Sequence, residues 1–268
     1  GAATVMSKLE DFLQTEWPEL KVYLTSVTDH FATVSVCGPH SKKILEKVVK
    51  NINFEDKNFP HMSFQEGLVD NIKCRVMRIS FTGELSYEIN IQANYGKAVW
   101  EKCMEAGKEF KITPYGTEAM HLLRAEKGFV IVGQETDGTI TPIDLQMDWI
   151  VSKKKYDFIG KRSLYRSDTI KEDRKQMVGL LTSDPNEVLE EGAQIVAEVK
   201  KKPPMDMLGH VTSSYYSPNL KKSIALAVVK NGKNLNGKKL YVPMKNKIIE
   251  VTVSDSVFID KDGKRLNA

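Results

Sequence analysis

A series of six short apolar segments follows residue 175, and it constrains the fold more than any other feature of the sequence. Turn-forming pairs separate the segments, among them Ser217-Pro218, Asn231-Gly232 and Asn236-Gly237. Short strands at this spacing, with turns between them, are typical of a small antiparallel barrel or sandwich. The segments are residues 177–181, 194–199, 208–212, 224–229, 239–243 and 248–253. We therefore predict a C-terminal antiparallel β-barrel domain over residues 175–268.

The part of the chain before this series mixes helical and extended patterns. Residues 31–38 alternate like a strand, and residues 72–80 and 87–92 flank a turn as the two strands of a hairpin. Apolar positions at helical spacing predict helices over residues 94–107 and 115–127. Strands and helices in this order favour an α+β fold with antiparallel sheets over a parallel, doubly wound sheet.

A polar and charged stretch without an apolar run, residues 160–176, indicates a boundary. We therefore predict one domain over residues 1–168 and the barrel domain over residues 175–268. No glycine-rich dinucleotide fingerprint is present, so the chain is not expected to contain a Rossmann site.

Composition and residue spacing argue against several classes of function. No apolar run approaches the roughly 20 residues needed to cross a bilayer, and the first residues lack the pattern of a secretory signal. The three cysteines have no CxxC spacing, which favours reduced thiols in the cytoplasm. The five histidines have no metal-ligand spacing, and the net charge of +4 comes partly from short lysine runs without interleaved aromatics. We expect no membrane, metal or nucleic-acid binding.

Two carboxylates, Glu84 and Glu88, lie within the segment FTGELSYE that begins at Phe81. If the residues after the turn are extended, alternation places Ser86 and Glu88 on one face of the strand and Tyr87 on the other. A carboxylate that projects from a strand into a cleft can accept two parallel hydrogen bonds from an aminopyrimidine ring. From spacing alone, two exposed hairpin carboxylates are the more common alternative.

Arg124 lies within the otherwise apolar helical segment LLRAEKGF. A buried arginine needs a partner, because an unpaired buried charge is costly. The partner is either internal, such as Glu118 or Glu126, or a ligand carboxylate held by the planar guanidinium group. Spacing does not choose between these two alternatives.

Several segments together resemble the folate-binding aminomethyltransferase (glycine cleavage T-protein) family. They occur in the order of the family and cover nearly the whole chain. Within the family, the chain is most similar to the C-terminal part of the alpha subunits of heterotetrameric sarcosine oxidases, because residues 1–29 are typical of that branch. The segments that carry the resemblance are residues 37–45, 80–89, 115–129, 141–164 and 209–229.

The resemblance implies roles for three residues. Glu88 matches the glutamate that hydrogen-bonds the pteridine ring of folate, and Arg124 matches the arginine near the folate tail. Phe81 is the third folate-binding residue that the resemblance implies, and it stands where glycine cleavage proteins usually carry a tyrosine, so it offers a ring without a hydroxyl. The implied fold is the aminomethyltransferase folate-binding fold, without its N-terminal part, followed by the barrel.

The resemblance also implies the reaction and the partners. In the whole complex, sarcosine is demethylated to glycine, and tetrahydrofolate takes up the one-carbon unit as 5,10-methylenetetrahydrofolate while oxygen is reduced to hydrogen peroxide. FAD, FMN and NAD are implied in the rest of the complex, and beta, gamma and delta subunits as partners. The acidic residue that assists the folate nitrogen lies upstream of the segment matching Gly1, so no catalytic residue is assigned here and the fragment alone is expected to be inactive.

Two other functions remain open from the sequence. A glycine cleavage aminomethyltransferase has the same fold and the same folate but no flavin subunit. A non-catalytic folate-binding module related to iron–sulfur maintenance proteins is of a different class, and its characteristic cysteine-containing signature is not found here.

Overall fold

The computed structural model describes residues 1–267, which form two compact units. Unit 1 comprises Gly1–Ser80, Glu84–Pro114 and the C-terminal residues from Arg265 on, and unit 2 comprises Phe81–Gly83 and Tyr115–Lys264. These units follow from the contacts within the chain. The domain boundary predicted between residues 168 and 175 stays a prediction.

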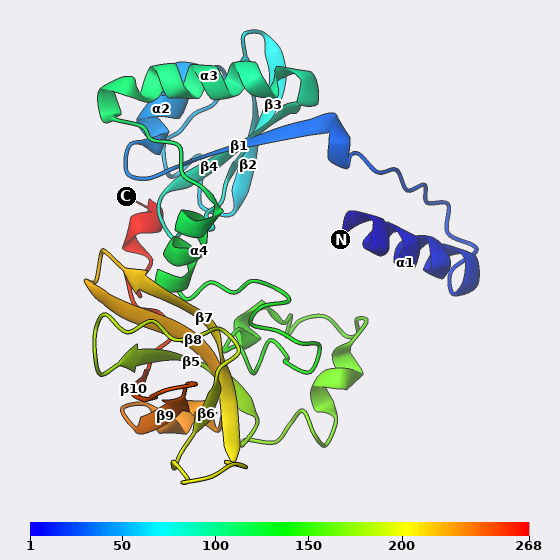
Figure 1. The fold of residues 1–268 in the computed structure, drawn as a ribbon. Helices are drawn as coiled ribbons and strands as arrows, with labels where there is room; N and C mark the ends of the chain where they lie inside the picture. Colours follow the sequence, from blue (N-terminus) through cyan, green and yellow to red (C-terminus); the bar gives the residue numbers. More distant parts are fainter. Residues whose placement is uncertain (268) are drawn as a thin grey trace. The chain divides into compact units, whose positions relative to one another are not determined.

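Unit 1 is built on a four-stranded antiparallel sheet with the strand order β1-β4-β3-β2 (Figure 1). The predicted strand at 31–38 and the predicted hairpin are confirmed, because β3 pairs with β4 and β4 pairs with β1. Strand β2 was not predicted, because its partly exposed side chains weaken the alternation of apolar residues. The strands are β1 (Phe31–Cys37), β2 (Ser63–Val69), β3 (Ile72–Arg78) and β4 (Ser86–Gln92).

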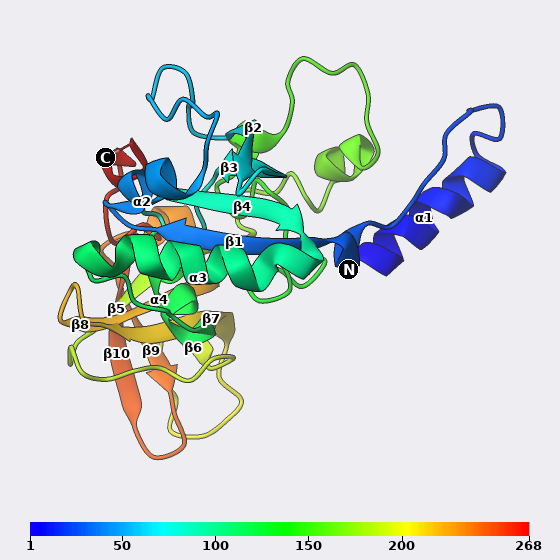
Figure 2. The ribbon, with the colours of Figure 1, turned by 90° about the horizontal axis from the view of Figure 1, so that it is seen from above.

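Helices α2 (Ser41–Val48) and α3 (Gly96–Gly107) cover one face of this sheet (Figure 2). Their apolar residues, together with every second residue of the strands, form the hydrophobic core of unit 1. Helix α1 (Ala2–Thr15), in contrast, has no buried residue. Ser41 does not cap α2 with its side chain as its position suggests, because its hydroxyl donates to the carbonyl oxygen of Leu85.

Unit 2 contains a closed antiparallel barrel with the strand order β10-β5-β8-β7-β6-β9 (Figure 1). All six predicted segments form strands, so the predicted barrel is confirmed. Helix α4 (Thr117–Glu126) packs against β7 and β8, which places its last turn next to the barrel wall. The barrel strands are β5 (Lys175–Thr182), β6 (Gln194–Val196), β7 (Met207–Ser217), β8 (Lys222–Lys230), β9 (Lys239–Pro243) and β10 (Ile248–Ser254).

One glycine of the barrel allows two strands to approach closely. A Cβ atom on Gly209 of β7 would lie 1.9 Å from the carbonyl oxygen of Val228 in β8, so no larger residue fits there without a backbone shift. Short 3-10 helices connect the larger elements. They are η1 (Thr28–His30), η2 (Ala93–Tyr95), η3 (Lys108–Phe110), η4 (Asp148–Ile150), η5 (Lys161–Tyr165), η6 (Gly232–Leu235) and η7 (Lys264–Asn267).

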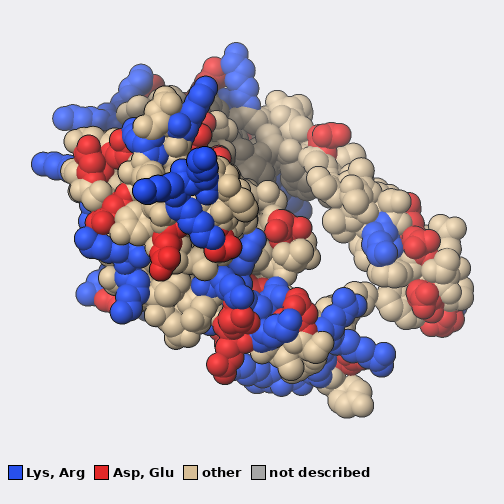
Figure 3. All heavy atoms as spheres, turned by 60° about the horizontal axis from the view of Figure 1, so that its bottom comes forward, with Lys and Arg blue, Asp and Glu red and all other residues tan. Residues whose placement is uncertain are grey.

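Charged side chains of both signs are interspersed on the face drawn in Figure 3. Ion pairs at the surface of the described residues include Lys200 with Asp206 and Lys247 with Glu187. Within residues 1–267, no helix has the length and hydropathy to cross a membrane. The same residues contain no cluster of three or more histidine, cysteine, aspartate or glutamate side chains that could hold a metal ion.

Candidate functional site

The candidate functional side chains of unit 1 lie on the face of its sheet that α2 and α3 do not cover. We call it the open face. Because alternate residues of a strand point to opposite sides, Tyr87, Ile89 and Ile91 of β4 enter the core while the residues between them lie on the open face. The side chains on the central part of the open face are those of Thr33, Ser35, Arg75, Met77, Glu88 and Asn90.

Glu88 lies between Ser35 of β1 and Met77 of β3 in the register of the sheet. Its side chain is half-buried, and among the described residues it has neither a hydrogen-bond partner nor an ion-pair partner. Burial raises the pKa of the Glu88 carboxyl above its ordinary value, because desolvation disfavours the charged form. A half-buried carboxyl without a protein partner is available to a ligand that donates hydrogen bonds.

Glu84, the other carboxylate of the same segment, is already paired. Its Oε1 atom lies 2.7 Å from Nη1 of Arg265, and both residues belong to unit 1. The structure therefore distinguishes two carboxylates that the sequence could not rank. Glu84 joins Arg265 to the segment before β4, whereas Glu88 has no such partner within residues 1–267.

Asn90, two residues beyond Glu88 on the same strand, has one half of its amide unpaired. Its Oδ1 atom accepts a hydrogen bond of 2.8 Å from the hydroxyl of Thr33. Its Nδ2 atom is buried and has no acceptor among the described residues. A buried donor without an acceptor costs about 1–3 kcal/mol. On the open face, the described residues thus offer no acceptor to Nδ2 of Asn90 and no partner to the nearby carboxyl of Glu88.

Arg124 lies on α4 in unit 2 and is completely buried. Its Nη1 atom donates to the carbonyl oxygen of Phe129 at 3.1 Å and to Glu135 Oε2 at 2.9 Å. Its Nη2 atom donates to the hydroxyl of Ser213 at 2.6 Å. The internal partner is thus Glu135, which is itself fully buried, and not Glu118 or Glu126 as the sequence suggested.

The sequence prediction placed Arg124 near the folate tail, and this assignment stays a prediction. The structure adds that the charge of Arg124 is neutralised by Glu135, while its Nε atom is buried without a partner among the described residues. Phe81 also lies in unit 2, and its side chain is 36% exposed. Glu88, in contrast, belongs to unit 1.

Glu126, two residues after Arg124, has internal partners as well. Its carboxylate accepts hydrogen bonds from the hydroxyl of Ser217 and from Nδ2 of Asn219, the latter at 2.9 Å. These contacts join the end of α4 to the last residue of β7 and to the turn that follows it. The buried carboxylates of unit 2 therefore stabilise the packing of α4, and this explains why an apolar helical segment contains charged residues.

Sequence reasoning missed the functional candidates on β3, together with Asn90 and Glu135. Alternation predicts that Arg75 lies on the same face of its strand as Met77, and Asn90 on the same face as Glu88. It does not show which face of the sheet the helices cover. Glu135 lies in an irregular segment eleven residues after Arg124, where no periodicity indicates a contact. These groups become recognisable only when the strands are paired and α4 is placed.

Comparison with protein families finds two matches along the chain. The family model described as the GCVT N-terminal domain matches residues 1–155. The model described as the glycine cleavage T-protein C-terminal barrel domain matches residues 175–260. Together the two matched regions include β1 to β4, α4 and the strands of the barrel.

Similar proteins fall into two groups. The sarcosine oxidase subunit alpha of Corynebacterium sp. (strain P-1) is 51% identical over 99% of the chain, and the match covers 28% of that protein. An aminomethyltransferase of Thermoanaerobacter sp. (strain X514) is 30% identical over 91% of the chain and 64% of that protein. The chain thus spans about a quarter of the length of the first relative and less than two thirds of the second.

A solved structure has the same fold. The crystal structure of the glycine cleavage system aminomethyltransferase T from Bartonella henselae aligns with a TM-score of 0.73. The alignment covers 94% of this chain and 66% of the other, at 21% sequence identity. This likeness shows the fold alone.

Proposed function

Because the chain belongs to the glycine cleavage T-protein (GCVT) family, we propose that it binds a reduced folate as a one-carbon transfer module. We further propose that it is the folate-binding part of an enzyme that demethylates sarcosine. The identity of 51% to a sarcosine oxidase subunit alpha favours this assignment over an aminomethyltransferase of the glycine cleavage system, for which the identity is 30%.

The observation that carries the proposal is the unpaired carboxyl of Glu88. When ionised, this group offers two acceptor oxygens, which match the ring N–H and the exocyclic amino group of a pteridine. Its half-burial on the open face excludes part of the competing water and strengthens such hydrogen bonds. The residues present therefore fit a pteridine.

The reduced folate supplies the nitrogen nucleophiles that accept the one-carbon unit. The chain itself binds and orients: Glu88 fixes the pteridine, and the neighbouring side chains of the open face limit the access of water. Orientation of this kind converts an encounter in solution into a reaction between fixed partners. The proposed products of the whole complex are glycine, 5,10-methylenetetrahydrofolate and hydrogen peroxide.

The chain alone is proposed to be catalytically silent. It spans 28% of the length of the sarcosine oxidase subunit alpha that it matches, and its sequence has no dinucleotide fingerprint. The other components of the proposed complex are beta, gamma and delta subunits with FAD, FMN and NAD in the remaining parts. Incubation of the purified chain with sarcosine, tetrahydrofolate and oxygen tests this. Peroxide or methylenetetrahydrofolate above a heat-treated control would contradict the proposal.

Folate binding is tested by calorimetric titration with 5-formyltetrahydrofolate, a stable reduced folate. Substitution Glu88→Gln removes the charged acceptor and is expected to weaken binding about 10- to 150-fold. The matched control is Glu84→Gln, which makes the same change on a carboxylate that Arg265 already pairs. Its affinity is expected to stay within about threefold of the parent. Equal affinity of Glu88→Gln and the parent chain would refute the assignment.

A further inference from the structure

A long irregular stretch of unit 2, residues 145–173, lies between α4 and β5 and contains no α-helix or strand. We call it the exposed loop, and it extends away from the barrel strands (Figures 1 and 2). Its base is closed, because Nη2 of Arg174 lies 2.8 Å from Oδ2 of the buried Asp144. Irregular stretches of this length are uncommon within a compact unit, and those that the fold holds in place are usually functional.

The exposed loop contains large apolar side chains but no buried residue. The side chain of Trp149 is 75% exposed, and that of Tyr156 is 96% exposed. Single apolar residues at a surface are normal, whereas several within one stretch mark an interaction site. The other large apolar residues that the loop exposes are Ile150, Ile159, Tyr165 and Ile170.

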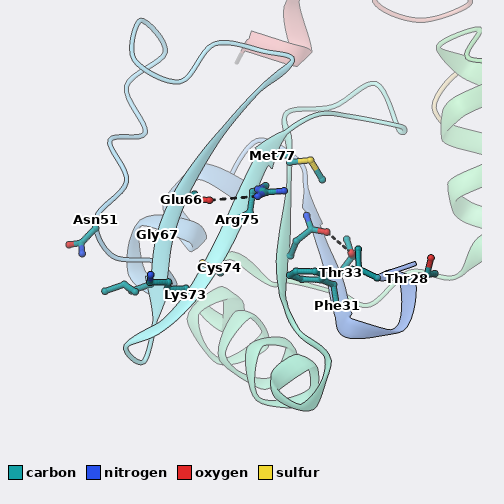
Figure 4. Close-up of a pocket in the computed structure, with 13 residues that line it drawn as sticks. Thr28, Phe31, Thr33, Asn51, Glu66, Gly67, Lys73, Cys74, Arg75 and Met77 are labelled. Atoms are coloured by element: carbon teal, nitrogen blue, oxygen red, sulfur yellow. Dashed lines mark hydrogen bonds and ion pairs between the residues drawn. The ribbon is translucent and has the colours of Figure 1, made fainter. Parts of the chain in front are cut away.

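The function proposed above gives the exposed loop no role. A pocket of about 660 Å³ in unit 1 shares Thr33, Met77 and Asn90 with the open face, so it is part of the candidate site already described (Figure 4). The exposed loop belongs to unit 2 and contributes no residue to this pocket. Its exposed apolar side chains therefore need a separate explanation.

The central part of the loop carries an excess of positive charge. Residues 149–166 contain six lysine and arginine side chains and a single acidic one, Asp157. None of the six forms an ion pair with another described residue. Lys161 instead donates to the carbonyl oxygen of Tyr156 and lies 5.8 Å from the centroid of its ring. Cations next to exposed aromatic rings match a partner that offers carboxylates around an apolar centre.

A protein face fits this combination better than a lipid surface or a nucleic acid does. In a bilayer, the irregular backbone of the loop would leave N–H and C=O groups without partners. On a nucleic acid, aromatic rings stack on bases, but the aliphatic side chains of Ile150 and Ile159 would gain no such contact. Tryptophan, tyrosine and arginine, in contrast, are the side chains most enriched at the centres of protein interfaces.

We propose that the exposed loop is a docking surface for an acidic, partly apolar face of the remaining part of the sarcosine-demethylating enzyme. The inference rests on the proposed function, because that function supplies the partner. The chain spans 28% of the length of the sarcosine oxidase subunit alpha that it matches, so an enzyme of that kind has extensive protein surface beyond this region. A second copy of this chain fits less well, because its net charge is +4.

Lysine acetylation tests the surface in the chain alone and in the enzyme purified through an affinity tag on this chain. In the enzyme, Lys153, Lys154 and Lys155 are expected to react with acetic anhydride at least about tenfold more slowly, because an interface excludes water. The matched control is the run of exposed lysines at residues 200–202 of the same unit, which should react at similar rates in both samples. Carbodiimide cross-linking should join Lys153–Lys155 to aspartate or glutamate residues outside this chain.

Variants separate docking from a role in the fold of the chain itself. The combined substitution Lys153→Glu, Lys154→Glu and Lys155→Glu should lower the Tm of the enzyme by more than about 2 °C and leave the Tm of the isolated chain unchanged. Tyr156→Ala should act in the same way, because its ring is almost fully exposed in the chain. Glutamate at residues 200–202 is the control, and it should leave both Tm values unchanged.

The outcomes distinguish this inference from the proposed function. Equal acetylation of Lys153–Lys155 in the chain and in an enzyme that demethylates sarcosine overturns the docking surface and leaves the proposed function standing. Cross-links confined to this chain or to a second copy also overturn it, as does protection that nuclease or detergent removes. Protection by protein in an assembly that does not demethylate sarcosine overturns the proposed function and the identity of the partner together. Protection, cross-links to outside carboxylates and a Tm loss limited to the enzyme support the inference.

Discussion

Arg124 and Glu135 form an ion pair of 2.9 Å in which both side chains are fully buried. Glu135 also accepts a hydrogen bond of 2.7 Å from the backbone N–H of Ile131 and a further one from the hydroxyl of Ser213. One carboxylate therefore joins α4, the irregular segment that follows it and strand β7. The pair is costly to desolvate, and it is stable only because hydrogen bonds satisfy nearly all of its atoms.

Substitution Glu135→Gln should reduce the free energy of unfolding by about 3–5 kcal/mol, because it leaves the guanidinium group of Arg124 buried without a counter-charge. Urea unfolding followed by circular dichroism measures this. The control Lys247→Gln breaks an exposed ion pair and should cost less than about 1 kcal/mol. If Glu135→Gln lowered the free energy of unfolding as little as the control does, the stability of the buried charge of Arg124 would not depend on Glu135. The double substitution Arg124→Met with Glu135→Leu should recover part of the loss.

Folate affinity should decrease as the pH is lowered through the raised pKa of Glu88. The protonated carboxyl loses its charge and one acceptor site, so binding requires the ionised form. An affinity series from pH 7.5 down to the ordinary pKa of a glutamate should show this loss in the parent chain and not in Glu88→Gln. A parent profile as flat as that of the variant would contradict the role of Glu88.

The raised pKa of Glu88 also affects stability, and this pH dependence runs in the direction opposite to that of folate affinity. Because the folded state raises the pKa of Glu88, it favours the protonated form relative to the unfolded chain. The contribution of Glu88 to the free energy of unfolding should therefore decrease as the pH rises from the unfolded pKa through the folded pKa. Replacement by glutamine should remove this contribution, which urea titrations at several pH values would measure.

Thiol reagents should modify Cys37 before the other two cysteines. Burial raises the pKa of Cys103 to about 11 and also raises the pKa of Cys74, whereas Cys37 is partly exposed. At pH 8 only about one in a thousand Cys103 side chains is a thiolate. Brief treatment with iodoacetamide should give one adduct by mass spectrometry, and Cys37→Ser should abolish it. Rapid labelling at Cys103 would show that this core opens locally.

Substitution Gly209→Ala should destabilise the barrel strongly, because the new methyl group would meet the carbonyl oxygen of Val228 at 1.9 Å. We expect a loss of more than about 3 kcal/mol, in the range of severe core overpacking. Gly116→Ala is the matched control, since a Cβ atom there has no neighbour within 4 Å. Similar urea midpoints for the two variants would show that β7 and β8 adjust more easily than the structure indicates.

The sequence by itself determined the elements whose local pattern is strong. The six segments after residue 175 became the barrel strands, since short apolar runs bounded by turn residues leave few other folds. The hairpin around Gly83 and the helices 96–107 and 117–126 were predictable for the same reason. Strand β2 was not, because its exposed residues interrupt the alternation. The rank of Glu88 over Glu84 rested on a family resemblance and not on spacing.

Only the tertiary structure decided which polar groups have partners. Glu84 and Glu88 are four residues apart, yet one pairs with Arg265 from the far end of the chain while the other has no partner among the described residues. Arg124 finds Glu135 through a segment without periodicity. Local sequence fixes the direction of a side chain through the period of its helix or strand, because that period is set by the backbone. Its partners come from other segments, and these are fixed only when the chain folds.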